Sequence, residues 1–192
     1  MGAGKRIIRG KVAILGDYAS GKTSLAQAFA TGGSGVPKSH SMTTDADIQV
    51  KSVLIPETDA QVDMFIVDLP GHEVYATTTE ALAAGASAFV ITVDVTSKDA
   101  LSGIGRWLKL AATIRTSSPL LGCLVATKCD ITDSRRVVQA QQAQDVARSL
   151  NLEYFECSSK TNTEVESPFF FIANALYETY EEHIASLTTG SS

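Results

Sequence analysis

The sequence lacks long apolar runs and basic blocks and has few cysteines, and each shortage excludes a class of protein. Its longest apolar runs are too short to span a membrane. The net charge is -5 and basic residues do not cluster, so nucleic-acid binding through phosphate neutralisation is not expected. The cysteines are odd in number and lack metal-ligand spacing, which predicts free thiols in a reducing compartment. They are Cys123, Cys129 and Cys157.

Signals for a lipid anchor are also missing. Arg6 stands where an N-terminal myristoylation signal needs Ser or Thr. Residues 188–192 contain no cysteine that could be prenylated, so we expect no direct lipid anchor. We expect residues 1–10 to form a flexible N-terminal tail, residues 11–187 to form one domain, and residues 188–192 to form a flexible C-terminal end.

The composition and the hydrophobic pattern predict an α/β fold. Hydrophobic residues make up 44% of the chain and charged residues 19%, which suits a sizeable core. Strand-length apolar runs alternate with helical patterns, which indicates a mostly parallel sheet with helices on both faces. Two half-buried runs flank a turn and predict one antiparallel hairpin. The six predicted strands are 12–15, 46–51, 62–67, 88–93, 122–126 and 153–156, and helices are predicted from about 22 and at about 75–84, 98–115, 137–150 and 166–187.

The segment after the first predicted strand fits the phosphate-binding loop pattern. It lies between a predicted strand and a predicted helix, which is the context that supports such a match over a chance glycine-rich turn. Main-chain N–H groups and the helix N-terminus can hold phosphate oxygens there. Lys22 can place its ammonium against the outer phosphates and is also a candidate catalytic residue. The segment reads Gly16-Asp17-Tyr18-Ala19-Ser20-Gly21-Lys22-Thr23, and the expected nucleotide contacts are Gly16, Ala19, Ser20, Gly21, Lys22, Thr23 and the following Ser24.

A magnesium site is predicted beside this loop. Thr23 can offer its hydroxyl to Mg²⁺, and Asp68 lies at the end of a predicted strand, where a carboxylate can hold the same ion. The alternative for Asp68 is an ordinary residue of a strand-to-turn junction. Thr43 is the third candidate ligand, and its neighbour Thr44 is an alternative. Gly71 can let the main chain approach the terminal phosphate and donate its N–H.

Two later segments predict recognition of guanine. Asp130 follows a buried strand and can accept two hydrogen bonds from the ring N–H and the exocyclic amine of guanine, a pair of donors that adenine lacks. Lys128 can lay its aliphatic stem over the base, and Thr127 retains hydrogen bonding where Asn is usual. The second segment closes the last strand, and its expected contacts with the base are Ser158, Ser159 and Lys160.

Together these motifs resemble the Ras superfamily of P-loop GTPases across about residues 11–187. Two further segments resemble its Rab branch: Asp94-Val95-Thr96 and Arg106-Trp107-Leu108. Outside the nucleotide motifs, the chain is similar to the Rab-like family of intraflagellar transport protein 27, also called Rab-like protein 4. That similarity rests on Ser24-Leu25-Ala26-Gln27, Met42-Thr43-Thr44 with Asp47, Lys51-Ser52-Val53-Leu54-Ile55-Pro56 and Glu166-Ser167-Pro168-Phe169.

The resemblance implies a function. It implies GTP and GDP as ligands with Mg²⁺, and a GTP-dependent subunit of intraflagellar transport complex B. The implied partners are the small β-sandwich subunit of that complex, in a heterodimer, and other complex B subunits. The implied location is the cilium or flagellum and the cytoplasm. The alternatives are a conventional Rab-type GTPase of vesicle traffic and a nucleotide-binding structural subunit without a hydrolytic cycle.

Two residues depart from the pattern of fast Ras-like GTPases. Tyr18 occupies a loop position that usually holds a small residue, so its ring should crowd the attacking water, unless it points to solvent. His72 stands where Gln usually orients that water. It either does this work, as in the similar string of elongation factors, or is a loop residue of a slow enzyme. We expect slow GTP hydrolysis.

The last predicted helix has more apolar side chains than one core-facing stripe needs. The stripe is expected to face the sheet. The surplus aromatic residues form either an exposed patch for a protein partner or part of a wide core-facing surface. The stripe consists of Phe169, Ile172, Leu176, Tyr180 and Leu187, and the surplus residues are Phe170, Phe171 and Tyr177.

Overall fold

The structure is a computed structural model that describes residues 5–34, 46–114 and 120–189. The six-stranded sheet has the order β2-β3-β1-β4-β5-β6. Only β2 runs antiparallel to its neighbour, so the predicted α/β fold with one antiparallel strand is confirmed. The strands are β1 (Arg6–Gly16), β2 (Asp47–Leu54), β3 (Ala60–Asp68), β4 (Ala88–Asp94), β5 (Gly122–Thr127) and β6 (Glu153–Glu156).

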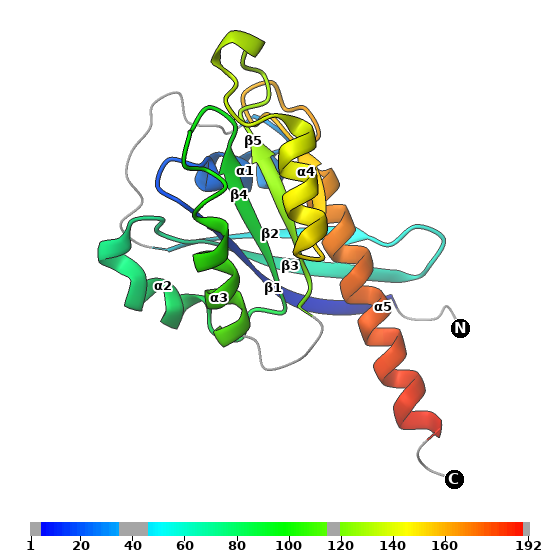
Figure 1. Cartoon of the computed structure of the whole chain (residues 1–192). Coiled ribbons are helices and arrows are strands. Elements are labelled where there is room, and N and C mark those ends of the chain that lie inside the picture. Colours follow the sequence, from blue (N-terminus) through cyan, green and yellow to red (C-terminus); the bar gives the residue numbers. More distant parts are fainter. Residues whose placement is uncertain (1–4, 35–45, 115–119, 190–192) are drawn as a thin grey trace.

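Helices cover both faces of the sheet, as Figure 1 shows. Side chains alternate across β1, so Val12 and Ile14 enter one core and Ala13 and Leu15 enter the other. The first core includes residues of α1 and α5, and the second includes residues of α2, α3 and α4. The helices are α1 (Lys22–Thr31), α2 (Ala76–Ala83), α3 (Ile104–Ile114), α4 (Ala140–Ser149) and α5 (Ser167–Thr189), with short 3-10 turns η1 (Glu73–Tyr75) and η2 (Asp133–Arg135).

Strand β1 begins earlier than the sequence predicted. Residues 6–10, expected in the flexible tail, pair in parallel with β3 from Arg6 opposite Ala60 onward. The Arg6 guanidinium also forms ion pairs with Asp59 and Glu181, which fastens the start of the strand. The pattern missed this extension because only Ile8 and Gly10 of its residues are buried, so main-chain pairing and not a continuous apolar run carries the strand. Helix α5 likewise continues to Thr189, past the predicted end of the domain at residue 187.

The apolar stripe predicted for α5 faces the sheet only in the first part of the helix. Figure 1 shows that the later part of α5 extends past the sheet. Phe169, Ile172 and Leu176 are buried there, whereas Tyr180 and Leu187 are exposed. Of the surplus aromatic residues, Phe171 and Tyr177 pack against the core and Phe170 is 42% exposed.

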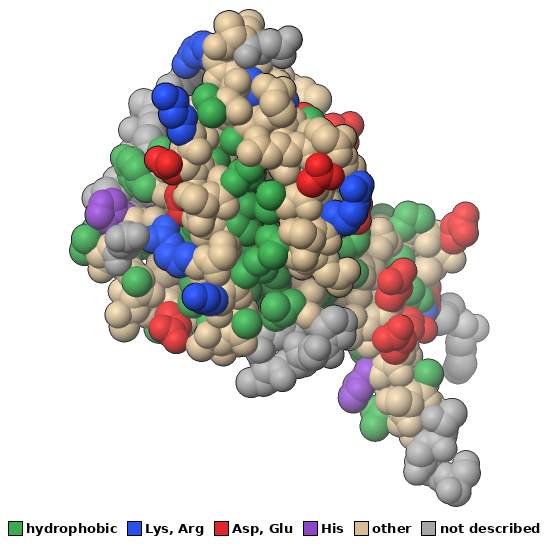
Figure 2. Space-filling view, viewed as in Figure 1, with side chains coloured by type: hydrophobic (Ala, Val, Ile, Leu, Met, Phe, Trp, Pro, Cys, Tyr) green, Lys and Arg blue, Asp and Glu red, His purple; other side chains and the backbone are tan. Residues whose placement is uncertain are grey.

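The surface view adds two features. Figure 2 shows hydrophobic side chains gathered in the band between α3 and α4, and acidic side chains along the extending part of α5.

Within the described ranges, the helices are all too short or too polar to cross a membrane.

Candidate nucleotide-binding site

The loop between β1 and α1 is shaped by three residues with positive φ. Gly21 has a φ of 90° and Ala19 a φ of 60°. Gly16 has a φ of 146°, and a Cβ atom there would collide with the hydroxyl of Thr92 on β4. This position therefore requires glycine. The Ser20 N–H donates to the Asp17 carbonyl at 3.2 Å and closes the loop. The loop therefore leads into the N-terminus of α1, the arrangement that binds phosphate.

Lys22 lies under this loop with its ammonium already directed at main-chain oxygens. Its Nζ donates to the carbonyls of Gly16 at 3.0 Å and Asp17 at 2.8 Å, and the residue is 6% exposed. Burial lowers the pKa of Lys22 to about 8, because the charged form loses hydration, although Asp68 and Asp17 partly oppose this. Both carbonyls are neutral acceptors, so a polyphosphate would be a stronger partner for this ammonium.

A pH dependence of nucleotide affinity follows from the pKa of Lys22. The protonated form of Lys22 binds phosphate, so bound nucleotide raises the pKa of Lys22. Above about pH 8 the free protein has lost this proton, and Lys22 must take it up again when nucleotide binds. We expect GDP affinity to be nearly constant at lower pH and to fall above pH 8, with a slope of up to about tenfold per pH unit. Calorimetric titration with GDP and Mg²⁺ between about pH 7 and 9 measures this. An affinity that stays constant across that range contradicts the expectation.

Gly71 lies against the phosphate loop. A Cβ atom at Gly71 would collide with the Lys22 Nζ and come within 2.7 Å of the Gly16 carbonyl oxygen. Only a glycine lets the main chain approach so closely. The structure therefore brings Gly71 close to Lys22, and the contact of its N–H with a terminal phosphate stays a prediction.

The described part of the predicted metal site fits Mg²⁺. The Thr23 hydroxyl donates to Asp68 Oδ2 at 2.6 Å, and the other carboxylate oxygen of Asp68 is buried without a hydrogen-bond partner. Burial raises the pKa of Asp68, an effect that the Thr23 hydrogen bond and Lys22 oppose. A buried acceptor without a donor is costly, and a hard cation would satisfy it. Thr43 and its alternative Thr44 lie outside the described residues.

The metal-ligand chemistry also suits this ion. Across residues 5–34, 46–114 and 120–189, no three His, Cys, Asp or Glu side chains gather in a possible metal site. Mg²⁺ does not need such a cage, because it commonly takes one or two protein oxygens and completes its shell with phosphate and water. Thr23 and Asp68 supply that limited set.

Asp130 is held rigidly by the segment after β6. Its Oδ1 accepts a hydrogen bond from Ser158 Oγ at 2.7 Å, and its Oδ2 lies 3.4 Å from Lys160 Nζ. Burial tends to raise the pKa of Asp130, but the Ser158 and Lys160 contacts outweigh it and lower the pKa. The Cys129 N–H donates to the Cys157 carbonyl at 3.1 Å and joins the two segments. Asp130 is thus ionised at neutral pH and preorganised as an acceptor.

Two other residues predicted to contact guanine, Thr127 and Lys128, have partners within the protein. The Thr127 hydroxyl lies within hydrogen-bond distance of the Ser20 carbonyl at 2.7 Å and the Val93 carbonyl at 3.1 Å, and the residue is buried. Thr127 therefore ties the guanine segment to the phosphate loop through these main-chain oxygens. Lys128 has a φ of 63°, and its Nζ donates to Asp94 Oδ2 at 2.6 Å. Asp94 thus fixes the lysine whose stem was predicted to cover the base.

Sequence reasoning missed two residues that support the phosphate loop. The hydroxyl oxygens of Thr92 in β4 and of Ser20 lie 2.6 Å apart. The Ser20 side chain therefore points into the protein, while its main-chain N–H closes the loop. A single hydroxyl inside an otherwise apolar strand was the available signal. Asp17 contacts α3 through its side chain, which no local pattern indicates.

Tyr18 and His72 lie together. Their ring centroids are 6.1 Å apart with an edge-on geometry, and Tyr18 is 49% exposed. The His72 Nδ1 accepts the Val74 N–H at 3.3 Å, which fixes the histidine within its own turn. The Tyr18 ring therefore does not simply point into solvent. The two departures from the fast pattern form one contact.

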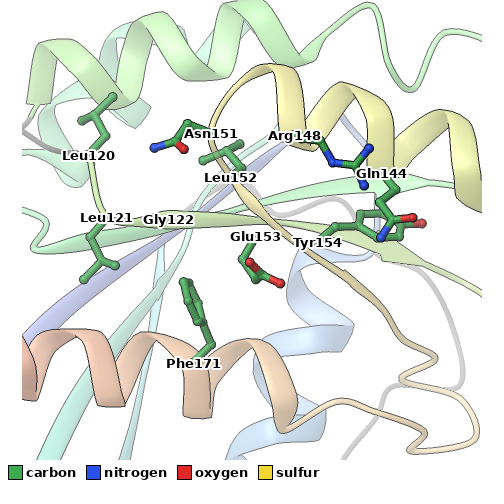
Figure 3. A pocket seen from close by; sticks show the side chains of 10 residues that line it. All are labelled: Leu120, Leu121, Gly122, Gln144, Arg148, Asn151, Leu152, Glu153, Tyr154 and Phe171. Carbon is green, nitrogen blue, oxygen red and sulfur yellow. The ribbon is translucent and has the colours of Figure 1, made fainter.

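A second hollow lies away from this site. Figure 3 shows its lining side chains, which come from the starts of β5 and β6, the end of α4, and α5. Its volume is about 420 Å³. Thr127 ends β5 and Asp130 follows it, at the opposite end of the strand from this hollow, so the hollow is separate from the predicted nucleotide site.

Comparisons with known proteins agree with the geometry. A family profile described as Ras family matches residues 11–178. The chain is 34% identical to the intraflagellar transport protein 27 homolog of Bos taurus, covering 91% of this chain and 93% of that protein. It is 30% identical to intraflagellar transport protein 27 of Chlamydomonas reinhardtii, covering 93% and 89%. It is also 32% identical to the Ras-related protein Rab-1 of Theileria annulata, covering 94% and 80%.

Proposed function

The chain belongs to the Ras family, and on that premise we propose that it binds GTP and GDP with Mg²⁺ at this site and hydrolyses GTP slowly. The observation that carries the proposal is the convergence of three groups at the carboxyl ends of the parallel strands. They are the buried ammonium of Lys22, the carboxylate of Asp68 with one unsatisfied oxygen, and the ionised carboxylate of Asp130. Ligands of open α/β sheets bind at these strand ends.

Each group has a separate task in the proposal. Lys22 and the main-chain N–H groups of the loop hold the phosphates, and Gly71 adds an N–H beside Lys22. Thr23 and Asp68 would hold Mg²⁺, which when bound neutralises charge on the phosphate oxygens. Asp130 selects guanine, and Ser158 and Lys160 keep its carboxylate in place.

The first experiment asks whether the purified, folded protein retains nucleotide. Protein prepared with Mg²⁺ is denatured, and the released nucleotide is identified and counted against protein. The proposal expects GDP or GTP in nearly equimolar amount, and expects chelation of Mg²⁺ to accelerate its release. Folded protein that retains no guanine nucleotide and binds none on addition contradicts the proposal.

Slow hydrolysis is expected to depend on the ring of Tyr18. Replacing Tyr18 with Gly removes the ring that contacts His72 and opens space for the attacking water. We expect Tyr18→Gly to raise the single-turnover rate of GTP hydrolysis about tenfold. Tyr18→Phe is the matched control, because it keeps the ring and should remain as slow as the wild type. Equal rates in all three proteins would remove Tyr18 from the explanation of slow turnover.

For the cellular role, we infer a subunit of intraflagellar transport complex B in the cilium or flagellum, with a cytoplasmic pool. Support comes from relatives named for intraflagellar transport that match the chain over most of its length. The inferred partner is the small β-sandwich subunit of that complex, in a heterodimer within the larger assembly. Exposed apolar side chains on the extending part of α5 also favour a protein partner, and they are Tyr180, Ile184 and Leu187.

A conventional Rab-type role in vesicle traffic is the second candidate, because the chain also resembles Rab-1. Affinity purification of the tagged chain from ciliated cells separates the two. Stoichiometric recovery of complex B subunits, with the tag in cilia, supports the first role. Recovery on vesicle membranes without those subunits supports the second.

A further inference from the structure

Asp17 places a carboxylate inside the loop that is proposed to bind phosphates. Its Oδ1 accepts hydrogen bonds from Trp107 Nε1 and from Arg106 Nη2, both at 2.7 Å. Its other oxygen lies against Gly103, where an added Cβ atom would collide with it. All three partners belong to the first turn of α3 or directly precede it. The side chain of Asp17 therefore fastens the loop to a helix far away in the sequence.

The main chain of the same residue organises the loop. The Asp17 carbonyl accepts the Lys22 ammonium at 2.8 Å and the Ser20 N–H at 3.2 Å. A shift of Asp17 would therefore move the acceptor of Lys22 and open the turn that presents the loop N–H groups. The contact with α3 thus acts on the groups that would hold phosphate.

Electrostatics favour a cationic partner for Asp17, although both side chains of the pair are partly exposed. A carboxylate beside a bound polyphosphate repels it, and this repulsion opposes binding unless a cation neutralises the carboxylate. The Arg106 guanidinium forms an ion pair with Asp17 and also lies 4.8 Å from the centre of the Trp107 ring. Its planar group thus neutralises Asp17 and packs on the indole that shares the same carboxylate oxygen.

From these contacts we propose that Asp17, Arg106 and Trp107 form an anchor that positions the phosphate loop for nucleotide. Arg106 is a positioning residue in this anchor: it cancels the charge of Asp17, and Asp17 holds the loop against α3. The inference rests on the proposed nucleotide function and adds a role for α3 in it.

A double-mutant cycle tests the neutralising role of Arg106. Calorimetry at low ionic strength measures affinity for GDP with Mg²⁺. Arg106→Ala leaves the charge of Asp17 uncompensated and should weaken affinity about fivefold. In the Asp17→Asn background the same substitution should have an effect of less than about twofold, because no charge remains to cancel. Arg106→Lys should restore most of the affinity. Effects that simply add in the double variant overturn the proposal.

Two glycines near the start of α3 provide a matched pair of variants. Gly103→Ala should displace the flexible Asp17 carboxylate, whereas Gly105→Ala meets no atom within 4 Å. Trp107 is the only tryptophan of the chain, so its fluorescence reports the lost hydrogen bond directly. We expect Gly103→Ala to shift the emission of Trp107 and to weaken GDP affinity, and Gly105→Ala to do neither. Equal behaviour of the two variants overturns the proposal.

The proposed nucleotide binding and the anchor can be contradicted separately. Wild-type protein that binds no GDP contradicts the proposed function, and in that case the Trp107 emission of the two glycine variants still decides whether the anchor exists. Wild-type protein that binds GDP, with an additive double-mutant cycle, contradicts the anchor alone.

Discussion

Replacing Lys22 with Ala is expected to lower affinity for GDP and GTP by at least about 100-fold, since the ammonium makes charge-assisted contacts worth about 1.5–3 kcal/mol each with phosphate oxygens. The Lys22 side chain is buried and its ammonium is already held at the main-chain carbonyls of the loop, so the wild type loses little side-chain entropy on binding. The deletion removes this preorganised charge and leaves the loop carbonyls without their donor. Equilibrium titration with a fluorescent GDP analogue in the presence of Mg²⁺ measures the change.

The matched control is Lys109→Ala, which removes an exposed lysine from α3 with the same formal change in net charge. It should alter affinity by less than about twofold, because an exposed charge is screened by solvent. A circular dichroism melt of both variants shows whether they fold. If folded Lys22→Ala binds GDP as tightly as the Lys109 variant, the phosphate site is assigned to the wrong residues.

The second large effect is expected for the base. Asp130→Asn should weaken GDP binding by at least about 100-fold, because the amide cannot accept hydrogen bonds from both the ring N–H and the exocyclic amine of guanine as the carboxylate does. Xanthine carries a carbonyl in place of that amine, and the Asn amide can donate to it. Affinity for xanthosine diphosphate should therefore rise while that for GDP falls. Competition titrations with the two nucleotides give both values.

Ser158 keeps one contact between the two guanine segments in this variant. The Asn side-chain oxygen can still accept the Ser158 hydroxyl, whereas the ion pair with Lys160 is lost. Asp145→Asn on α4 removes an exposed carboxylate and serves as the control, with no expected change in base preference. Unchanged preference in folded Asp130→Asn would mean that another group reads the base.

The phosphate and guanine parts of the site are joined through Thr127. Its hydroxyl contacts the carbonyl of Ser20 in the phosphate loop and that of Val93 in β4. Gly21 packs against the same side chain, with an added Cβ atom falling 3.3 Å from the Thr127 hydroxyl. A movement of one part therefore displaces the other. This explains why a short threonine suits the position where the sequence predicted a direct contact with the base.

Much of the fold followed from hydrophobic pattern. The continuous apolar runs that became β1, β4 and β5 are buried on both faces, as their composition required. The alternating runs 46–51 and 62–67 became the antiparallel pair β2 and β3, but the expected half-burial of the first run was wrong, because its Ile48 and Val50 are exposed. The pattern failed at residues 6–10 and at the end of α5. In the first, main-chain pairing, ion pairs and the buried Ile8 hold a short segment that is not a continuous apolar run, and in the second the helix continues where the sheet beneath it has ended.

The sequence by itself located the phosphate-loop segment, the Thr23 and Asp68 residues of the proposed metal site and the Asp130 segment. Their chemistry requires particular residue types at fixed short spacing beside a strand or a helix, and such spacing is visible along the chain. Only the tertiary structure decided that Asp17 meets Trp107 and that Tyr18 meets His72. Each of these contacts joins residues far apart in sequence. The order of strands in the sheet and the helices packed on it bring such residues together, and no local pattern encodes that proximity.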